Sequence, residues 1–383
     1  MTREKEKQKC KINIGSVLGA AVRSPRFWLI MLFPAALLLI AAARNIPCFA
    51  DLYANTVYRA VSLFWNNLSG ILPFSLAEFI VVIAPFALLA YIIVSAVITV
   101  RSKGRRLKAL LKSFVSLLAA VSLIFFLYIT NCGLNYYCTR FSAQSGLAVK
   151  KVTAQQLYRV CEYYADMAAS SRAEISRDDG SPLAADVSSL RFAARDAVNV
   201  LHERFPSVAG GYSVPKSVIL SRGMSYLDIT GVYFPFTFEA NVNTDAGDYC
   251  LPFTMCHELA HVRGFMNEAD ANFIAFLACV RSDDPWLRYS GSMNALRLLQ
   301  GHLYTADESL YKQLLSHYSA GMFTDLKAQS EYWKQFETPV AAAASSINDS
   351  YLKINRQQEG VKSYGLAADL IIACYFDEHE TDG

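Results

Sequence analysis

Three long apolar runs in the first third of the chain constrain its fold more than any other feature. The runs are Phe27–Ala43, Phe79–Val100 and Ser113–Ile129, each 17 to 22 residues long. A helix needs about 20 residues to cross a hydrocarbon layer about 30 Å thick, so each run is long enough to span a bilayer. We therefore expect a membrane domain at residues 1–131, with three transmembrane helices at about 27–43, 79–100 and 113–129.

The remaining residues, 132–383, have the composition of a soluble domain with a core of its own. The 53% hydrophobic content of the whole chain reflects the crowding of apolar residues into the three runs. Residues 153–156 form a capping-box pattern, so we expect a helix to start at Thr153. Further helices are expected through 190–201 and around 254–280, 292–300 and 306–318, with strands at 218–220 and within 231–243, where Pro235 interrupts the second. The predicted domain is therefore mostly helical, of the α+β class.

Basic residues predict how the chain is oriented in a membrane. Thirteen of the 36 lysines and arginines lie in residues 1–26 and 101–112, whereas the loop at 44–75 carries only Arg44 and Arg59. Cytoplasmic flanks of membrane helices are enriched in lysine and arginine. We therefore expect a multi-pass cell-membrane protein with a cytoplasmic amino terminus and an extracytoplasmic domain at 132–383. The rest of the chain has fewer basic than acidic residues, so no nucleic-acid partner is expected. The thirteen are Arg3, Lys5, Lys7, Lys9, Lys11, Arg23, Arg26, Arg101, Lys103, Arg105, Arg106, Lys108 and Lys112.

Two features near the membrane segments and in the outer domain leave alternatives open. The small residues at 41–43 are of the kind that a signal peptidase accepts, and cleavage there would leave two spans. Seven cysteines lie beyond residue 131, so at least one is unpaired within the chain. Cys279 and Cys374 occur in apolar helical patterns, which favours buried thiols. The sequence does not fix any disulfide pairing.

The segment His257-Glu258-Leu259-Ala260-His261 has the HExxH pattern of zinc peptidases. Residues four apart lie on the same face of a helix, so His257 and His261 can offer two imidazole nitrogens to one Zn²⁺. Glu258 lies about 100° around the helix from His257, beside the metal, where it can act as the general base that deprotonates a water molecule. We therefore predict a zinc cofactor, with Glu258 as the catalytic residue.

A catalytic zinc also requires a third protein ligand, and the candidates are Glu268 and Asp270. Asn267 has the character of a helix N-cap, and Asp270 stands three residues on, at the acidic capping-box position. Glu268 has no such structural role, so we favour it as the metal ligand. Asn272 lies one turn after Glu268 and is expected to steady the carboxylate of Glu268.

Several motifs together resemble an uncharacterised bacterial membrane family, domain of unknown function 3810. They are PFSLAEFI at 73–80, NCGLNYY at 131–137, VYFPFTFEANVN at 232–243, HELAHVRGFMNEADANFIAFLAC at 257–279, YSG at 289–291, NDSYLKIN at 348–355 and GVKSYG at 360–365. The resemblance implies three membrane helices and a zincin-like domain, but no substrate. The Glu-x-x-Ala-Asn pattern at 268–272 is also similar to the third-ligand segment of several glutamate-type zinc peptidases, which implies Glu268. Thermolysin-like enzymes have a longer gap before that glutamate, and Asp270 stands where the family more often has a second glutamate.

The leading functional hypothesis is a membrane-anchored zinc metallopeptidase that cleaves a peptide, protein or wall-associated amide outside the cytoplasm. The alternative is a zinc-binding sensor or scaffold that keeps the zincin fold without catalysis. Intramembrane proteolysis is excluded, because the polar residues at 258–272 cannot share an apolar span. Tyr233, Tyr289 and His302 are weaker candidates for stabilising an oxyanion, with packing as the alternative role. The segment 234–243 is a candidate edge for strand addition by a peptide, with an ordinary strand and loop as the alternative.

Overall fold

The structure is a computed structural model that describes residues 22–355, 357 and 364–379. The basic residues Arg3, Lys5, Lys7, Lys9 and Lys11, and most of the GVKSYG motif, lie outside the described residues. The chain forms two compact units, which we describe separately. The first consists of Met1–Asn45 and Ala84–Thr130, and the second of Ile46–Ile83 and Asn131–Gly383.

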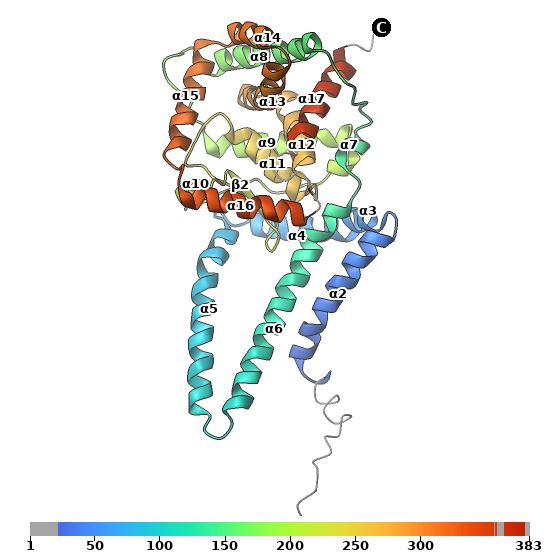
Figure 1. The fold of residues 1–383 in the computed structure, drawn as a ribbon, viewed down its shortest axis with the longest axis vertical. Helices are drawn as coiled ribbons and strands as arrows, with labels where there is room; N and C mark the ends of the chain where they lie inside the picture. The colour runs from blue at the N-terminus through green and yellow to red at the C-terminus, as the bar shows by residue number, and fades with distance from the viewer. Residues whose placement is uncertain (1–21, 356, 358–363, 380–383) are drawn as a thin grey trace, which may run out of the picture. The chain divides into compact units, whose positions relative to one another are not determined.

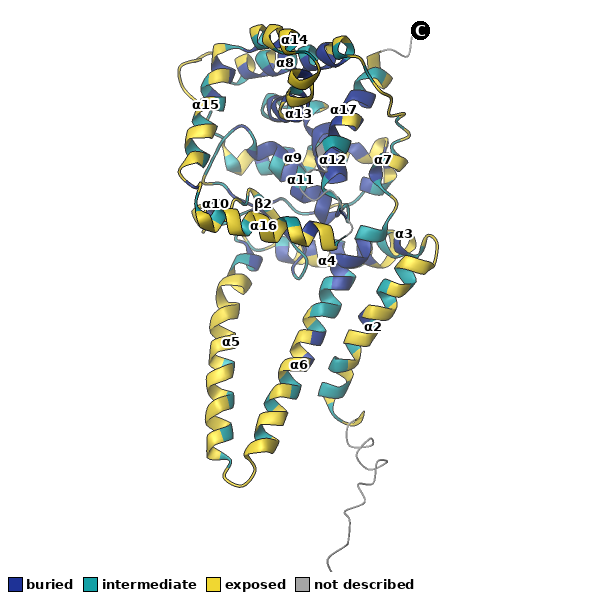
Figure 2. Ribbon diagram, in the orientation of Figure 1, coloured by how far each residue is buried: buried dark blue, intermediate teal, exposed yellow. Residues whose placement is uncertain are grey.

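Three helices long and apolar enough to cross a membrane supply the first unit. They are α2 (Pro25–Asn45), α5 (Leu76–Arg101), whose first turns belong to the second unit, and α6 (Arg106–Asn131). Nearly all of α5 is exposed, as Figure 2 shows. The predicted apolar helices are confirmed, and each continues a few residues past its apolar run because polar residues at its ends also adopt helical backbone.

The segment between α2 and α5 belongs to the second unit. It contains α3 (Phe49–Tyr53), the π-helical turn η1 (Ala54–Tyr58) and α4 (Arg59–Gly70). The Asn66 side chain explains part of this attachment, because its amide donates to the carbonyl of Phe238 at 2.7 Å and accepts from the N–H of Ser213 at 2.6 Å. The sequence-based division at residue 131 grouped this segment with the membrane helices, whereas the compact units divide the chain differently.

Helices make up most of the second unit (Figure 1). The capping box predicted at Thr153 is present, since Thr153 and Gln156 exchange side-chain and backbone hydrogen bonds at the start of α8. The long helices are α8 (Ala154–Ile175), α9 (Val187–Val200), α11 (Leu251–Val262), α12 (Glu268–Val280), α13 (Pro285–Ala306), α15 (Ala320–Lys334), α16 (Pro339–Ile354) and α17 (Tyr364–His379). The short ones are η2 (Gly133–Tyr137), α7 (Phe141–Gln144), η3 (Leu201–Glu203), η4 (Pro206–Val208), α10 (Ser221–Ser225), α14 (Glu308–Leu314) and η5 (Leu315–His317).

A small sheet accompanies these helices and confirms the expectation of few strands. Its order is β1 (Lys216–Ser217), β3 (Glu239–Val242), β2 (Gly231–Phe234), with β1 parallel and β2 antiparallel to β3. The strand predicted at 218–220 is wrong, because the strand covers the two preceding residues and the backbone turns at Ile219 and Leu220, while Val218 still donates to the carbonyl of Val242 at 3.2 Å. The strand predicted within 231–243 is two strands joined by a tight turn in which Phe238 has a φ of 56°.

The core of the second unit lies around α12, which packs against α9, α11, α13 and α17. From Ala269 to Cys279 every residue of α12 is buried, including the large side chains Phe273, Ile274 and Phe276. α11 packs against α12 on one side and against β2 and β3 on another. This arrangement fixes the HExxH helix between the helical core and the sheet. Cys279 and Cys374 are buried thiols, as predicted, and the cysteines within the described residues are free.

Candidate metal site

The HExxH residues lie on α11, and Pro252, in its first turn, has a backbone angle preset for a helix. His257 and His261 are one turn apart, and their ring centroids are 4.6 Å from each other. The His261 side chain is buried and that of His257 nearly so. The helix therefore brings both imidazoles to one place, as the spacing predicts.

Hydrogen bonds orient both rings in the same sense. The Nδ1 atom of His257 lies 2.9 Å from Oδ1 of Asn272, and that of His261 lies 2.8 Å from the carbonyl oxygen of Phe265. These oxygens accept, so each Nδ1 carries a proton, and the Nε2 atom is the one that each ring directs toward Glu268. A histidine that donates through one nitrogen and offers the other is the usual form of a metal ligand.

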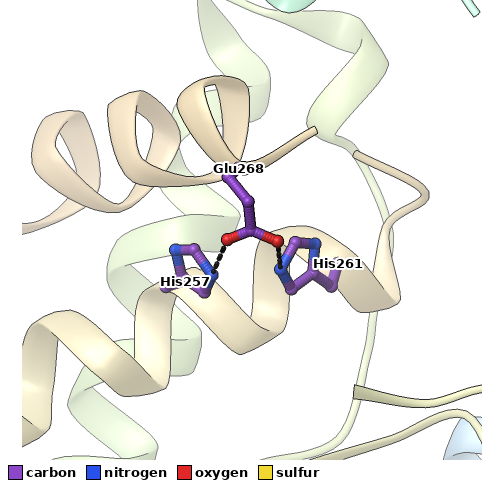
Figure 3. Close-up of side chains that lie close together, drawn as sticks. All are labelled: His257, His261 and Glu268. Carbon is purple, nitrogen blue, oxygen red and sulfur yellow. Dashed lines mark ion pairs between the residues drawn. The ribbon is translucent and has the colours of Figure 1, made fainter. Parts of the chain in front are cut away.

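A sharp turn after α11 brings the third candidate ligand back to the histidines. Gly264 makes this turn with a φ of 97°, and a Cβ there would lie 3.0 Å from the Tyr58 ring. Asn267 then caps α12, since its side chain accepts from the N–H of Ala269, as predicted. Glu268 is the first residue of α12, and its carboxylate lies 3.3 Å from Nε2 of His257 and 3.6 Å from Nε2 of His261 (Figure 3).

The donor set fits a zinc ion. Its three residues form a group with one ligand atom each within 4.8 Å of the others. Ligands held at about 2.0–2.2 Å from a tetrahedral zinc are about 3.3–3.6 Å apart, which is the separation of Glu268 from the two histidines. Two neutral imidazoles and one carboxylate are also the ligands of a common class of catalytic zinc sites.

Asp270, the alternative third ligand, is turned elsewhere. Its carboxylate pairs with Nε of Arg140 at 2.9 Å, and it lies outside the group formed by His257, His261 and Glu268. Arg140 also donates to the side chain of Asn267. The two acidic residues of the first turn of α12 thus have different partners, and Glu268 is the one brought to the histidines.

Glu258 lies beside this group, against strand β2. It is 4% exposed, and its Oε2 atom has no hydrogen-bond partner among the described residues. Gly231 leaves room for it, because a Cβ at that position would lie 2.5 Å from Oε1 of Glu258. The backbone N–H of Tyr233 bonds to the same carboxyl group. A buried carboxyl with one free oxygen is able to exchange a proton with a reacting molecule.

The site separates the charge states of its carboxyl groups. Burial raises the pKa of Glu258 to about 8, and the nearby charge of Glu268 adds to this effect. Burial also acts on Glu268, but the adjacent His261 and His257 outweigh it and lower the pKa of Glu268 to about 2. Burial lowers the pKa of His261 to about 4, which keeps this ring neutral at pH 7. An ionised Glu268 beside a neutral imidazole suits a cation, whereas Glu258 is poised for proton transfer.

One predicted role changes, and the three weaker candidates lie outside the metal-ligand group. Asn272 accepts from His257 rather than steadying Glu268. The Tyr233 hydroxyl donates to the carbonyl of Asn131 at 3.0 Å, and the Tyr289 hydroxyl donates to Asp325 at 2.7 Å. His302 lies exposed on α13 and outside the metal-ligand group. Both tyrosine hydroxyls thus donate to groups other than the HExxH side chains, which supports the packing role for the two tyrosines.

The structure adds Tyr58 and Gly231, which the sequence did not single out. The buried Tyr58 hydroxyl donates to the carbonyl of Val262 at 2.9 Å and lies 3.2 Å from the hydroxyl of Tyr233. It therefore satisfies a carbonyl at the end of the HExxH helix from a position 204 residues away. The one sequence feature that marks Gly231 is its position directly before the VYFPFTFEANVN motif at 232–243.

Comparison with known proteins gives a family without a described activity. No curated protein matches the chain, and no solved structure does. A family described as "Protein of unknown function (DUF3810)" matches residues 53–372, a range that contains α4, the sheet and the whole metal-ligand group. The chain therefore belongs to the DUF3810 family.

Proposed function

We propose that this protein is a membrane-anchored, zinc-dependent metallopeptidase that hydrolyses peptide or amide bonds outside the cytoplasm. The observation that carries the proposal is the convergence of His257, His261 and Glu268. The Nδ1–H group of each histidine donates elsewhere, to Asn272 or to the carbonyl of Phe265. The Nε2 atoms of both histidines face one carboxylate, at 3.3 and 3.6 Å, which is the arrangement of three ligands around a single cation. The adjacent Glu258, buried and half-unpartnered, supplies the second requirement of hydrolysis.

The metal ligands and Glu258 have separate roles in the proposed hydrolysis. His257, His261 and Glu268 hold the zinc, which when bound polarises a carbonyl group and lowers the pKa of water to about 7. Glu258 accepts the proton that the attacking water loses as its oxygen bonds to the carbonyl carbon. The same carboxyl then gives this proton to the departing amine as the C–N bond breaks. Burial raises the pKa of Glu258 to about 8 in the site without metal, and the charge of a bound cation would lower it toward the range in which a carboxyl group accepts a proton at neutral pH.

We propose that an extended substrate binds along strand β2. The segment 234–243 was the candidate edge, but β3 is paired on both sides and cannot accept another strand. β2 pairs only with β3 among the described strands and packs against α11. A peptide added along β2 would run past Glu258, because Gly231 and Tyr233 both contact that carboxyl group.

The orientation of the site follows from the basic residues that flank the apolar helices. The described members of this set are Arg23, just before α2, Arg26 in the first turn of α2, and the basic residues at 101–112 around the turn between α5 and α6. Under the positive-inside rule these ends are cytoplasmic, which leaves the second unit on the opposite side. We accordingly propose that substrates are extracytoplasmic peptides or proteins.

The test is a comparison of the native chain with Glu258→Gln in cells. We expect the glutamine variant to bind zinc and fold normally, while cleavage of outer-surface peptides falls about a hundred- to ten-thousand-fold. Glu203→Gln, at an exposed position, is the matched control and should behave as the native chain does. Identical peptide profiles for the native and Glu258→Gln proteins, beside a distinct deletion phenotype, would favour the sensor or scaffold instead.

A further inference from the structure

Helix α4 packs against the rest of the second unit through its polar face. Its buried residues are polar and lie at helical spacing: Ser62, Asn66 and Ser69. Ser62 lies 2.9 Å from the hydroxyl of Tyr212, Asn66 donates to the carbonyl of Phe238, and Ser69 donates to the carbonyl of Thr237 at 3.1 Å. A helix on the surface of a soluble protein instead buries its apolar face. The polar side of α4 is thus the side that holds it in the second unit.

The opposite face of this region is apolar and exposed. We call it the apolar face, defined by Leu52, Val57, Phe64, Trp65, Leu68 and Ile71. Their exposed fractions run from 45% for Leu68 to 76% for Ile71. Exposed large apolar side chains that recur along one segment mark a surface that contacts a protein or a membrane.

The chain on both sides of this segment leads directly into helices that are able to span a membrane. α2 ends at Asn45 and α5 begins at Leu76, so the segment is tethered at both ends. The start of α5 is also fixed to the second unit, because the Glu239 carboxylate accepts from the N–H groups of Leu76 and Ala77 at 3.2 and 2.8 Å. The apolar face therefore belongs to the part of the second unit from which the membrane helices depart.

A second exposed apolar pair lies at the same place. The carboxylate of Glu78, in the first turn of α5, accepts from the N–H groups of Ile219 and Leu220 at 2.9 and 2.7 Å. These two side chains are 72% and 55% exposed. A segment from far along the chain thus adds apolar surface beside the beginning of α5.

We infer that the apolar face of residues 52–71 lies on the lipid bilayer, at the boundary between headgroups and acyl chains. Lipid is the occupant that fits, because the segment continues into membrane helices at both ends. Amphipathic helices with tryptophan, phenylalanine and leucine on one face bind at this depth. The segment 44–75 also carries only Arg44 and Arg59 as basic residues, as expected for an outer-leaflet surface.

This contact bears on the candidate metal site whether or not the protein is a peptidase. Tyr58 directly precedes α4 and donates to the carbonyl of Val262 at the end of the HExxH helix. A bilayer-bound α4 is therefore one hydrogen bond from α11. The bilayer would fix the height of the metal-ligand group above the lipid surface.

Trp65 provides the probe for a direct test. The full chain would be prepared with Trp65 as its single tryptophan, the other three replaced by phenylalanine, in vesicles whose phosphatidylcholine is brominated either near the carbonyl or near the chain end. We expect the shallow bromines to remove most of the Trp65 emission, deep bromines to remove less, and aqueous iodide to have little effect. Chains that keep only Trp286, at the start of α13, are the control and should not be quenched by either lipid.

Two results would overturn the inference. Quenching of Trp65 by iodide but not by brominated lipid would place α4 in water, and protection from both quenchers would mean that protein covers it. If the triple replacement does not fold, the native chain and its Trp65→Phe variant give the same quantity by difference. A Trp65→Phe change that leaves lipid quenching of the native chain unaltered would equally contradict the bilayer contact.

Discussion

Helices α5 and α12 are both rich in apolar residues, yet their surroundings are opposite. Almost every side chain of α5 is exposed on the protein, whereas α12 is buried from Ala269 to Cys279 (Figure 2). The difference lies in length. α5 continues for 26 residues, long enough to cross a bilayer, while α12 has 13 residues and begins with Glu268 and Asp270. The shorter helix is a core element of the second unit, and its first residue, Glu268, belongs to the candidate metal site.

The largest expected effect is a difference between α12 and α5 in how much stability the protein loses when an aromatic ring is removed. Phe276→Ala in α12 removes a fully buried ring and should lower the free energy of unfolding by about 3–5 kcal/mol, because the cavity cannot collapse. Phe86→Ala in α5, where the ring is 69% exposed, should cost far less, since lipid fills the vacated space. Thermal unfolding of both variants in the same lipid particles measures the contrast. Equal losses would mean that α5 is also packed against protein.

A second test compares a packed glycine with an open one. Gly231→Ala places a methyl group against the Glu258 carboxyl and should cost about 1–3 kcal/mol of stability through overpacking. Gly301→Ala on α13 has no neighbour within 4 Å and should be neutral or stabilising. In a Glu258→Ala background the Gly231→Ala cost should largely disappear. A cost that persists in this background would show that Glu258 is not the neighbour that makes the glycine necessary.

A smaller effect is expected at the buried polar end of α12. Asn272→Ala removes the acceptor for Nδ1 of His257 and should weaken zinc binding about ten- to a hundredfold. Asn272→Asp keeps an acceptor oxygen and should restore most of the affinity. Competition with a zinc chelator measures both variants. Unchanged affinity in Asn272→Ala would show that the ring of His257 is oriented by packing alone.

The sequence predicted what depends on local pattern. The three apolar helices follow from run length, the start of α8 from the Thr153 capping box, and the meeting of His257 with His261 from helical spacing. Glu268 followed from the absence of another role for it. These predictions need only neighbours within a turn or two of helix.

What the sequence did not predict depends on long-range packing. Tyr58 contacts Val262 across 204 residues, and no local pattern marks such a pair. The strand predicted at 218–220 failed because the N–H groups of Ile219 and Leu220 donate to Glu78 of α5 instead of pairing in the sheet. Asn272 lies on the expected face of α12, but its side-chain oxygen accepts from Nδ1 of His257.

The metal content of two variants of α12 tests the central claim most directly. The full chain would be purified without chelators and its zinc measured by elemental analysis, beside Glu268→Gln and Asp270→Asn. We predict about one zinc per chain in the native protein and in Asp270→Asn, whose carboxylate pairs with Arg140, and loss of zinc in Glu268→Gln. A native chain without stoichiometric metal, or a greater loss of zinc in Asp270→Asn than in Glu268→Gln, would contradict the account.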